Sequence, residues 1–164
     1  MSAVDDLLTN NEEFAWKFDG GGLPRSPSRG IAVVACMDAR VDVYRLLGLA
    51  LGDAHVIRNA GGVVTEDVVR SLLVSQRLLG TREIALVHHT DCGMQGVREE
   101  DVTAQVQAET ARPLPFSLEA FDDLVTSVRE SIARLRANPF LPHTDRIRGF
   151  IYDVETGRLA EVRP

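Results

Sequence analysis

The chain has 164 residues, about the size of one domain, and its 45% hydrophobic and 26% charged residues are typical of a globular protein. Its net charge is −6 and it has no dense basic run, which argues against nucleic-acid binding. Its apolar stretches are shorter than the roughly 18 residues of a membrane span, and its acidic N-terminus lacks the features of a signal peptide. We therefore expect a single α/β domain, 1–164, in the cytoplasm, with neither nucleic acid nor membrane as a partner.

The N-terminal segment is expected to be a helical arm. Residues 1–18 carry enough apolar side chains for one amphipathic helix that needs a surface to lie on: Val4, Leu7, Leu8, Phe14, Trp16 and Phe18. The Gly- and Pro-rich stretch 20–30 is typical of a connector. It also resembles a phosphate-binding loop, but no Gly-Lys-Ser/Thr ending follows it. We therefore predict that an arm of about 1–29 packs on a partner subunit.

From Gly30 onward, short β-favouring runs alternate with segments of helical periodicity, as in a parallel α/β sheet. Strands are expected at 31–35, 54–58, 84–88, 148–154 and 159–162. Helices are expected at 43–51, from an N-cap at Thr65 to Gly80, at 99–110, and from an N-cap at Ser117 to Asn138. The predicted fold is α/β, with a mainly parallel central sheet, an added C-terminal antiparallel strand and flanking helices.

The two cysteines of the chain each follow one of these strand-like runs. Cys36 opens the sequence Cys-Met-Asp-Ala-Arg after the first strand, and Cys92 closes the sequence His-Thr-Asp-Cys after the third. If the second strand packs on one side of the first and the third on the other, the ends of strands one and three meet. We therefore expect the sheet order 2-1-3-4, with Cys36 and His89 at adjacent strand ends about 5 Å apart.

The side chains at these strand ends predict a zinc site. Two thiolates and one imidazole, from Cys36, His89 and Cys92, suit tetrahedral zinc, and three protein ligands leave a fourth position open, as in catalytic sites. Asp38 could occupy that position and close the site. Alternatively, Asp38 could pair with Arg40 and accept a hydrogen bond from zinc-bound water, which would leave the site open.

These motifs resemble those of the β-class carbonic anhydrases. Members of that family have Cys-x-Asp-x-Arg after the first strand, Arg-Asn-x-Ala/Gly after the second and His-x-x-Cys-Gly after the third. The counterparts here are CMDAR at 36–40, RNAGG at 58–62 and HTDCG at 89–93, and the resemblance covers about 31–96. Many members have serine at the position of Met37, so the chain resembles a shorter, less typical branch.

The resemblance implies one Zn²⁺ per subunit on Cys36, His89 and Cys92, with Asp38 and Arg40 as a catalytic dyad and Asp38 a metal ligand only in a closed state. It implies reversible hydration of carbon dioxide to bicarbonate and a proton by zinc-bound hydroxide. It also implies a homodimer or higher oligomer whose N-terminal arms cross to the partner. Two alternatives are a non-catalytic zinc-binding or sensing protein with a closed Cys-Asp-His-Cys site, and a hydrolase of carbon disulfide or carbonyl sulfide on the same site.

Other polar residues have simpler interpretations. Strand alternation turns His88 away from His89, so a packed core histidine is expected there. His55 and His143 are expected at the surface or in loops. Asp91 lies inside the ligand loop and could hydrogen-bond a group that supports the site, but a solvated loop aspartate is expected.

The turn after the second strand is expected to serve the structure. Arg58 and Asn59 are expected to buttress the loops of the site rather than to contact substrate. Gly61 and Gly62 are expected to permit positive φ.

Overall fold

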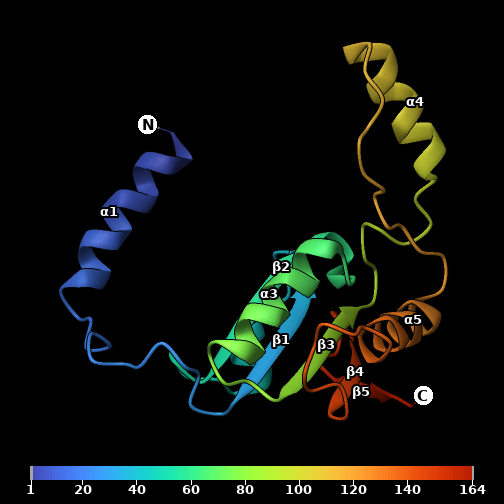
Figure 1. Cartoon of the computed structure of the whole chain (residues 1–164). Helices are drawn as coiled ribbons and strands as arrows, with labels where there is room; N and C mark the ends of the chain where they lie inside the picture. Colours follow the sequence, from blue (N-terminus) through green and yellow to red (C-terminus); the bar gives the residue numbers. More distant parts are fainter. Residues whose placement is uncertain (1, 164) are drawn as a thin grey trace.

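The computed structural model describes residues 2–163 and contains one five-stranded sheet in the order β2-β1-β3-β4-β5 (Figure 1). The strands are β1 Ile31–Cys36, β2 Ala54–Asn59, β3 Glu83–His89, β4 Ile147–Tyr152 and β5 Leu159–Val162. The first four strands are parallel, and β5 pairs with β4 in the antiparallel direction. The predicted fold class and strand order are confirmed, so the carboxyl ends of β1 and β3 are neighbours.

The helices are α1 Ala3–Ala15, α2 Val43–Leu47, α3 Glu66–Arg77, α4 Glu99–Thr110 and α5 Leu124–Arg136, with a short 3₁₀ turn η1 at Ala60–Gly62. Helices α3 and α5 cover one face of the sheet, where Leu72 and Val128 share a buried core with Leu86 of β3. Gly149 of β4 permits the close approach of α5, because a Cβ there would lie 2.3 Å from Cγ1 of Val128. Two closely packed helices therefore cover this face of the sheet.

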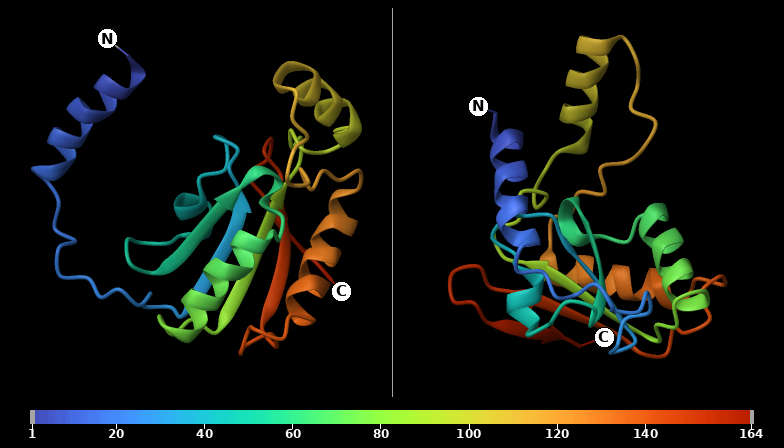
Figure 2. Two further views of the ribbon diagram at one scale, coloured as in Figure 1. Left: turned by 45° about the horizontal axis from the view of Figure 1, so that its top comes forward. Right: turned by 90° about the vertical axis from the view of Figure 1, so that its left-hand side faces the viewer.

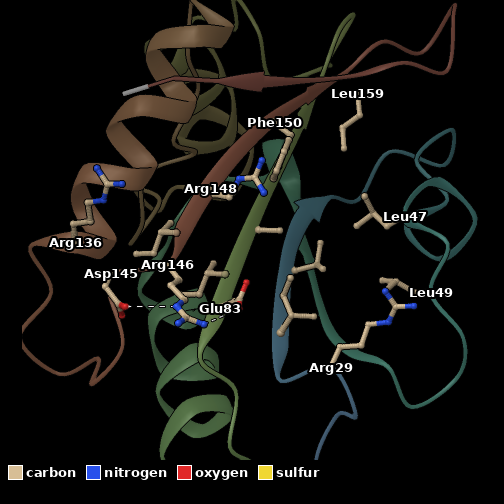
Figure 3. Close-up of a pocket in the computed structure, with 15 residues that line it drawn as sticks. Arg29, Leu47, Leu49, Glu83, Arg136, Asp145, Arg146, Arg148, Phe150 and Leu159 are labelled. Atoms are coloured by element: carbon tan, nitrogen blue, oxygen red, sulfur yellow. Dashed lines mark hydrogen bonds and ion pairs between the residues drawn. The ribbon is translucent and has the colours of Figure 1, made fainter.

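The opposite face of the sheet is only partly covered by α2 and the residues that follow it. A trough of about 500 Å³ remains over β1, β3 and β4, with Val33 and Ala85 among its apolar lining (Figure 3). Its arginine side chains are Arg29, Arg136, Arg146 and Arg148. This face thus presents apolar surface beside guanidinium groups.

Two predicted helices have different bounds in the structure. The long helix begins at Leu124 rather than after Ser117, because Asp123 is its N-cap and accepts a hydrogen bond from the Thr126 amide at 2.7 Å. Ser117 instead accepts a hydrogen bond from the Glu119 amide, and Glu119 has φ +57°, which breaks any helix there. Helix α2 ends at Leu47 rather than near residue 51, because the next residue is a left-handed glycine cap.

Helices α1 and α4 extend away from the sheet and its helices (Figures 1 and 2). Neither helix contains a buried residue. Helix α1 forms all the same because Ser2 and Asp5 make a reciprocal capping box at its N-terminus. Between residues 2 and 163, no helix is both long and apolar enough to cross a membrane.

Candidate metal centre

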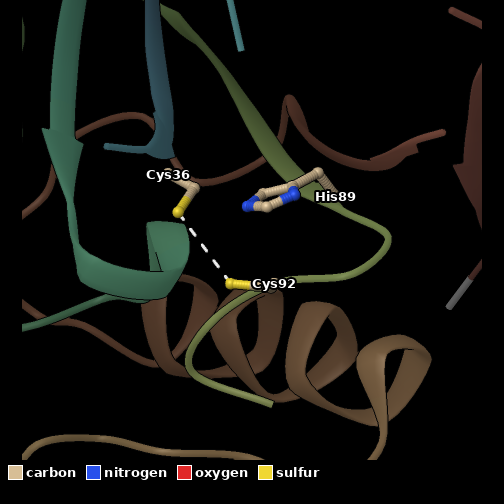
Figure 4. Close-up of side chains that lie close together, drawn as sticks. All are labelled: Cys36, His89 and Cys92. Atoms are coloured by element: carbon tan, nitrogen blue, oxygen red, sulfur yellow. Dashed lines mark hydrogen bonds between the residues drawn. The ribbon is translucent and has the colours of Figure 1, made fainter. Parts of the chain in front are cut away.

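The ends of β1 and β3 bring three potential metal-binding side chains together. Cys36 is the last residue of β1, His89 is the last residue of β3, and Cys92 follows three residues later. Their ligand atoms all lie within 4.8 Å of one another, and all three side chains are buried (Figure 4). The adjacency that the strand order predicts therefore extends to the side-chain atoms themselves.

The spacing of the two sulfur atoms suits a shared metal ion better than a disulfide. The Sγ atoms of Cys36 and Cys92 are 3.9 Å apart, whereas a disulfide bond is about 2.05 Å long. Two Zn–S bonds of about 2.3 Å at a tetrahedral angle would separate the sulfurs by about 3.8 Å. The two thiols thus already stand at the separation that tetrahedral zinc requires.

The imidazole of His89 has one ring nitrogen bonded and the other unsatisfied. Nδ1 lies 2.8 Å from the Thr90 carbonyl, a contact in which Nδ1 is the donor and Nε2 keeps its lone pair. Nε2 is buried and has no hydrogen-bond partner among the described residues. A buried polar atom without a partner is costly, and a backbone carbonyl on the other nitrogen is the usual support for a metal-binding histidine. The residues present therefore fit a metal ion.

The surroundings of Cys92 disfavour its thiolate form as long as no cation is nearby. Burial raises the pKa of the Cys92 thiol to about 11, and the neighbouring Cys36 sulfur adds to the effect. A bound divalent cation would reverse this shift by stabilising the thiolate. Metal binding at this site should therefore release protons.

Asp38 and Arg40 form a close ion pair at the edge of the centre. The Arg40 side chain donates from Nε to Oδ1 of Asp38 at 3.0 Å and from Nη2 to Oδ2 at 2.7 Å, and its backbone amide also donates to Oδ1. The hydrogen bonds from Arg40 hold the pKa of the Asp38 carboxyl well below its usual range. Oδ2 of Asp38 lies 3.8 Å from Nε2 of His89. Asp38 thus stays charged beside the three ligands while its oxygens are bonded to Arg40.

The loop that carries Cys36 and Asp38 is supported from the end of β2. Arg58 donates to the carbonyl oxygens of Cys36 at 2.9 Å and of Asp38 at 2.7 Å. Gly62, at φ +69°, packs so tightly that a Cβ there would lie 2.8 Å from the Cys36 amide nitrogen. The predicted structural roles of Arg58 and of the glycine turn are confirmed.

One of the sequence-based interpretations is wrong, and another is incomplete. His55 is not a simple surface residue, because it is half-buried on β2 and Nδ1 lies 2.7 Å from Oγ of Ser75. Asp91 is solvent-exposed as expected, but its Oδ2 accepts a hydrogen bond from Nη1 of Arg40 at 2.7 Å. Neither pairing has a local sequence signal, because each joins residues of separate elements.

The interpretations of the other two histidines agree with the structure. His88 is fully buried on the face away from His89, where its ring packs near Phe121, and burial lowers its pKa to about 4. His143 lies in a loop, and its amide donates to the Gln76 side chain.

Comparisons with known proteins point to one family. The family profile described as carbonic anhydrase matches residues 31–159. The chain is 54% identical to β-carbonic anhydrase 1 of Mycobacterium tuberculosis over the full length of both proteins. Its structure resembles the crystal structure of a carbonic anhydrase from Streptococcus mutans with a TM-score of 0.93, 44% identity and 99% of each chain covered. A carbon disulfide hydrolase of Acidianus is 33% identical, over 95% of this chain and 87% of that protein.

Proposed function

This chain belongs to the β-class carbonic anhydrases, and we propose from that premise that Cys36, His89 and Cys92 hold the zinc ion with which it hydrates carbon dioxide reversibly to bicarbonate and a proton. The observation that carries the site is the convergence of these ligand atoms within 4.8 Å, with Nε2 of His89 buried and unpartnered. We propose one zinc ion per subunit, because the described residues contain one such group.

Zinc in this position would supply a Lewis acid that brings the pKa of water close to neutral. The charge of two thiolates would offset that of the cation and limit the effect. The chain's own contribution is to place two ligands at strand ends and a third in the loop after β3, with Thr90 orienting the His89 ring through its carbonyl. Three protein ligands on a tetrahedral ion would leave one position for the reacting water.

We propose that Asp38 acts as a charged acceptor that orients the attacking water. Its low pKa keeps it ionised at neutral pH, and Arg40 bonds both of its oxygens while Oδ2 stays 3.8 Å from Nε2 of His89. This arrangement supports an open site rather than a permanently closed Cys-Asp-His-Cys sensor. Arg40 therefore determines whether Asp38 orients the water or coordinates the zinc ion.

Stopped-flow hydration of carbon dioxide by the zinc-loaded full chain tests the proposal. We expect rapid hydration from protein that contains one zinc per chain by metal analysis. A Cys92→Ser variant should lose both zinc and activity, while an Asp67→Asn variant, remote from the site, should keep both. Zinc-loaded parent protein without activity at any pH up to about 9 would refute the function, because zinc-activated water is ionised well below that pH.

Hydrolysis of carbon disulfide or carbonyl sulfide is a second candidate, which the 33% identical carbon disulfide hydrolase favours. The 54% identity to a β-carbonic anhydrase over the whole chain supports carbon dioxide more strongly. Assays of the three substrates side by side on one protein preparation separate the two functions. Faster turnover of either sulfur compound than of carbon dioxide would reverse the preference.

We also propose a homodimer or higher oligomer in which an arm of about 1–29 packs on the partner and the chain acts as one zinc-binding domain. The apolar side chains of α1 support this, because Leu8 is 66% exposed and Trp16 is 90% exposed. Sedimentation of the full chain and of a Trp16→Asp variant tests the proposal. A parent that stays monomeric at micromolar concentration would contradict it.

We propose the cytoplasm as the location of the protein. Both cysteines are free thiols, and a reducing compartment keeps a closely spaced pair available for metal. Fractionation of cells that express the full chain tests this location.

A further inference from the structure

Asp91 lies between two of the proposed zinc ligands, His89 and Cys92, and contacts the dyad rather than the ligands. We propose that Asp91 is a positioning residue for the carbonic anhydrase reaction: it anchors the Arg40 guanidinium and thereby keeps Asp38 out of the open zinc position. This inference rests on the proposed function, and it names a residue outside the ligand set and the dyad.

The Arg40 guanidinium is shared equally between two loops. It donates two hydrogen bonds to Asp38, from Nε and Nη2, and two to Asp91, from Nη1 to Oδ2 at 2.7 Å and from Nη2 to the backbone carbonyl at 2.9 Å. Asp38 is two residues away in sequence, whereas Asp91 is 51 residues away and follows a different strand. Because the guanidinium is planar and rigid, fixing one edge on Asp91 fixes the edge that faces Asp38.

A second anchor matters because Asp38 is close to the ligands. Its Oδ2 is 3.8 Å from Nε2 of His89, so a small movement of the carboxylate would bring it among the ligand atoms. Arg40 lies on the same loop as Asp38 and has a long, flexible stem that is 47% exposed, so by itself it could follow that movement. Its two hydrogen bonds to Asp91 would have to break first.

The backbone of Asp91 has a positive φ angle where its side chain and carbonyl contact Arg40. Its φ of +54° lies in the left-handed region, which aspartate and asparagine tolerate better than most residues. Its side chain is 79% exposed, so water screens the charge of its pair with Arg40. The anchor therefore depends on the positions of two acceptor oxygens more than on the negative charge.

Three variants of the full chain test this role, each loaded with zinc for activity and with cobalt(II) for the visible absorption spectrum. Asp91→Gly removes the carboxylate while keeping positive φ, and Asp91→Asn keeps an acceptor without the charge. Asp67→Asn is the matched control, because Asp67 forms an exposed pair with Arg70 at 2.8 Å on α3, outside the site.

We expect Asp91→Gly to lower both kcat and kcat/KM for carbon dioxide about tenfold, as is usual when a residue that supports a metal site is lost. Its cobalt spectrum should shift toward that of Arg40→Ala, in which Asp38 has no guanidinium. Asp91→Asn should stay within about twofold of the parent, because the acceptor positions remain. In an Asp38→Ala background, Asp91→Gly should leave the cobalt spectrum unchanged.

Other outcomes would overturn the proposal. If Asp91→Gly matches the parent in rate and spectrum, Asp91 does not position Arg40. If its spectral shift persists in the Asp38→Ala background, Asp91 acts by another route. An active parent with an unaffected Asp91→Gly variant refutes this inference alone, whereas an inactive zinc-loaded parent refutes the proposed function and this inference together.

Discussion

The strand-end loops and the projecting helices α1 and α4 differ in how many contacts they make with the rest of the chain. Around the candidate metal centre, Arg58 and Arg40 each bridge loops that are far apart in sequence. Helices α1 and α4 have no buried residue; Ser2 and Asp5 cap the N-terminus of α1, whereas no side chain caps that of α4. The first region is fixed by tertiary contacts that few substitutions should leave intact, whereas the second should tolerate substitution.

Loss of one proposed ligand should have the largest effect. Cys92→Ser should lower carbon dioxide hydration by at least about a thousandfold, because the activation of water by zinc is lost. Metal analysis measures the loss of zinc, and stopped-flow kinetics measures the loss of hydration on the same sample. Substitution in α4, for example Gln105→Ser, is the matched control and should leave zinc content and rate unchanged. A Cys92→Ser variant with full zinc and full rate would remove Cys92 from the site.

Arg40→Ala should have the next largest effect. The variant removes the guanidinium from Asp38, and we expect it to keep zinc while hydration falls about 10- to 100-fold. Metal analysis before each kinetic run distinguishes this outcome from simple metal loss. Equal loss of zinc and rate would show that Arg40 supports the ligands rather than the open position.

The same substitution at a position packed against the sheet and at one on a projecting helix compares buried with exposed surface directly. Leu72→Ala, at a fully buried position of α3, should lower the free energy of unfolding by about 2–5 kcal/mol. Leu8→Ala on exposed α1 should change it by less than about 0.5 kcal/mol in dilute protein. Urea denaturation measures both. If the effect of Leu8→Ala grows with protein concentration, a second copy covers α1, as the proposed oligomer requires.

The smallest expected effect concerns Asp53, at the start of β2. Its carboxylate accepts hydrogen bonds from the Ala50 amide, Ser28 and Arg29, and these contacts lower its pKa from the ordinary 3.8. The unfolded state therefore binds the Asp53 proton more readily than the folded state does. The contacts of the charged carboxylate stabilise the fold fully at a pH above the ordinary pKa, and this stabilisation is lost as the pH falls through the lowered pKa of the folded state. Urea denaturation from pH 3 to 7 measures the free energy of unfolding of the parent and of Asp53→Asn. The difference between the two free energies should shrink toward pH 3. A constant difference would contradict this role.

Much of the fold could be read from local pattern. The β-favouring runs at 31–35 and 84–88 predicted the strands β1 and β3, and the helix at 99–110 has the predicted bounds. The beginning of α5 was predicted too early, after Ser117, because Ser117 and Asp123 are both good N-caps. The choice between them depended on the left-handed turn at Glu119 and on the packing of Phe121 near His88.

The sequence by itself determined which chemical groups lie at the ends of β1 and β3. The β-favouring pattern shows where each strand ends, and the sequence gives the residues at that point. Only the tertiary structure decided how those groups combine: the 3.9 Å between the sulfurs, the unpartnered Nε2 of His89, and the pairing of Arg40 with both Asp38 and Asp91. Hydrogen bonds act over about 3 Å, and pairs from different strands reach that distance only once the sheet has formed. For that reason Asp91 reads as an ordinary loop residue in the sequence and as an anchor for Arg40 in the folded chain.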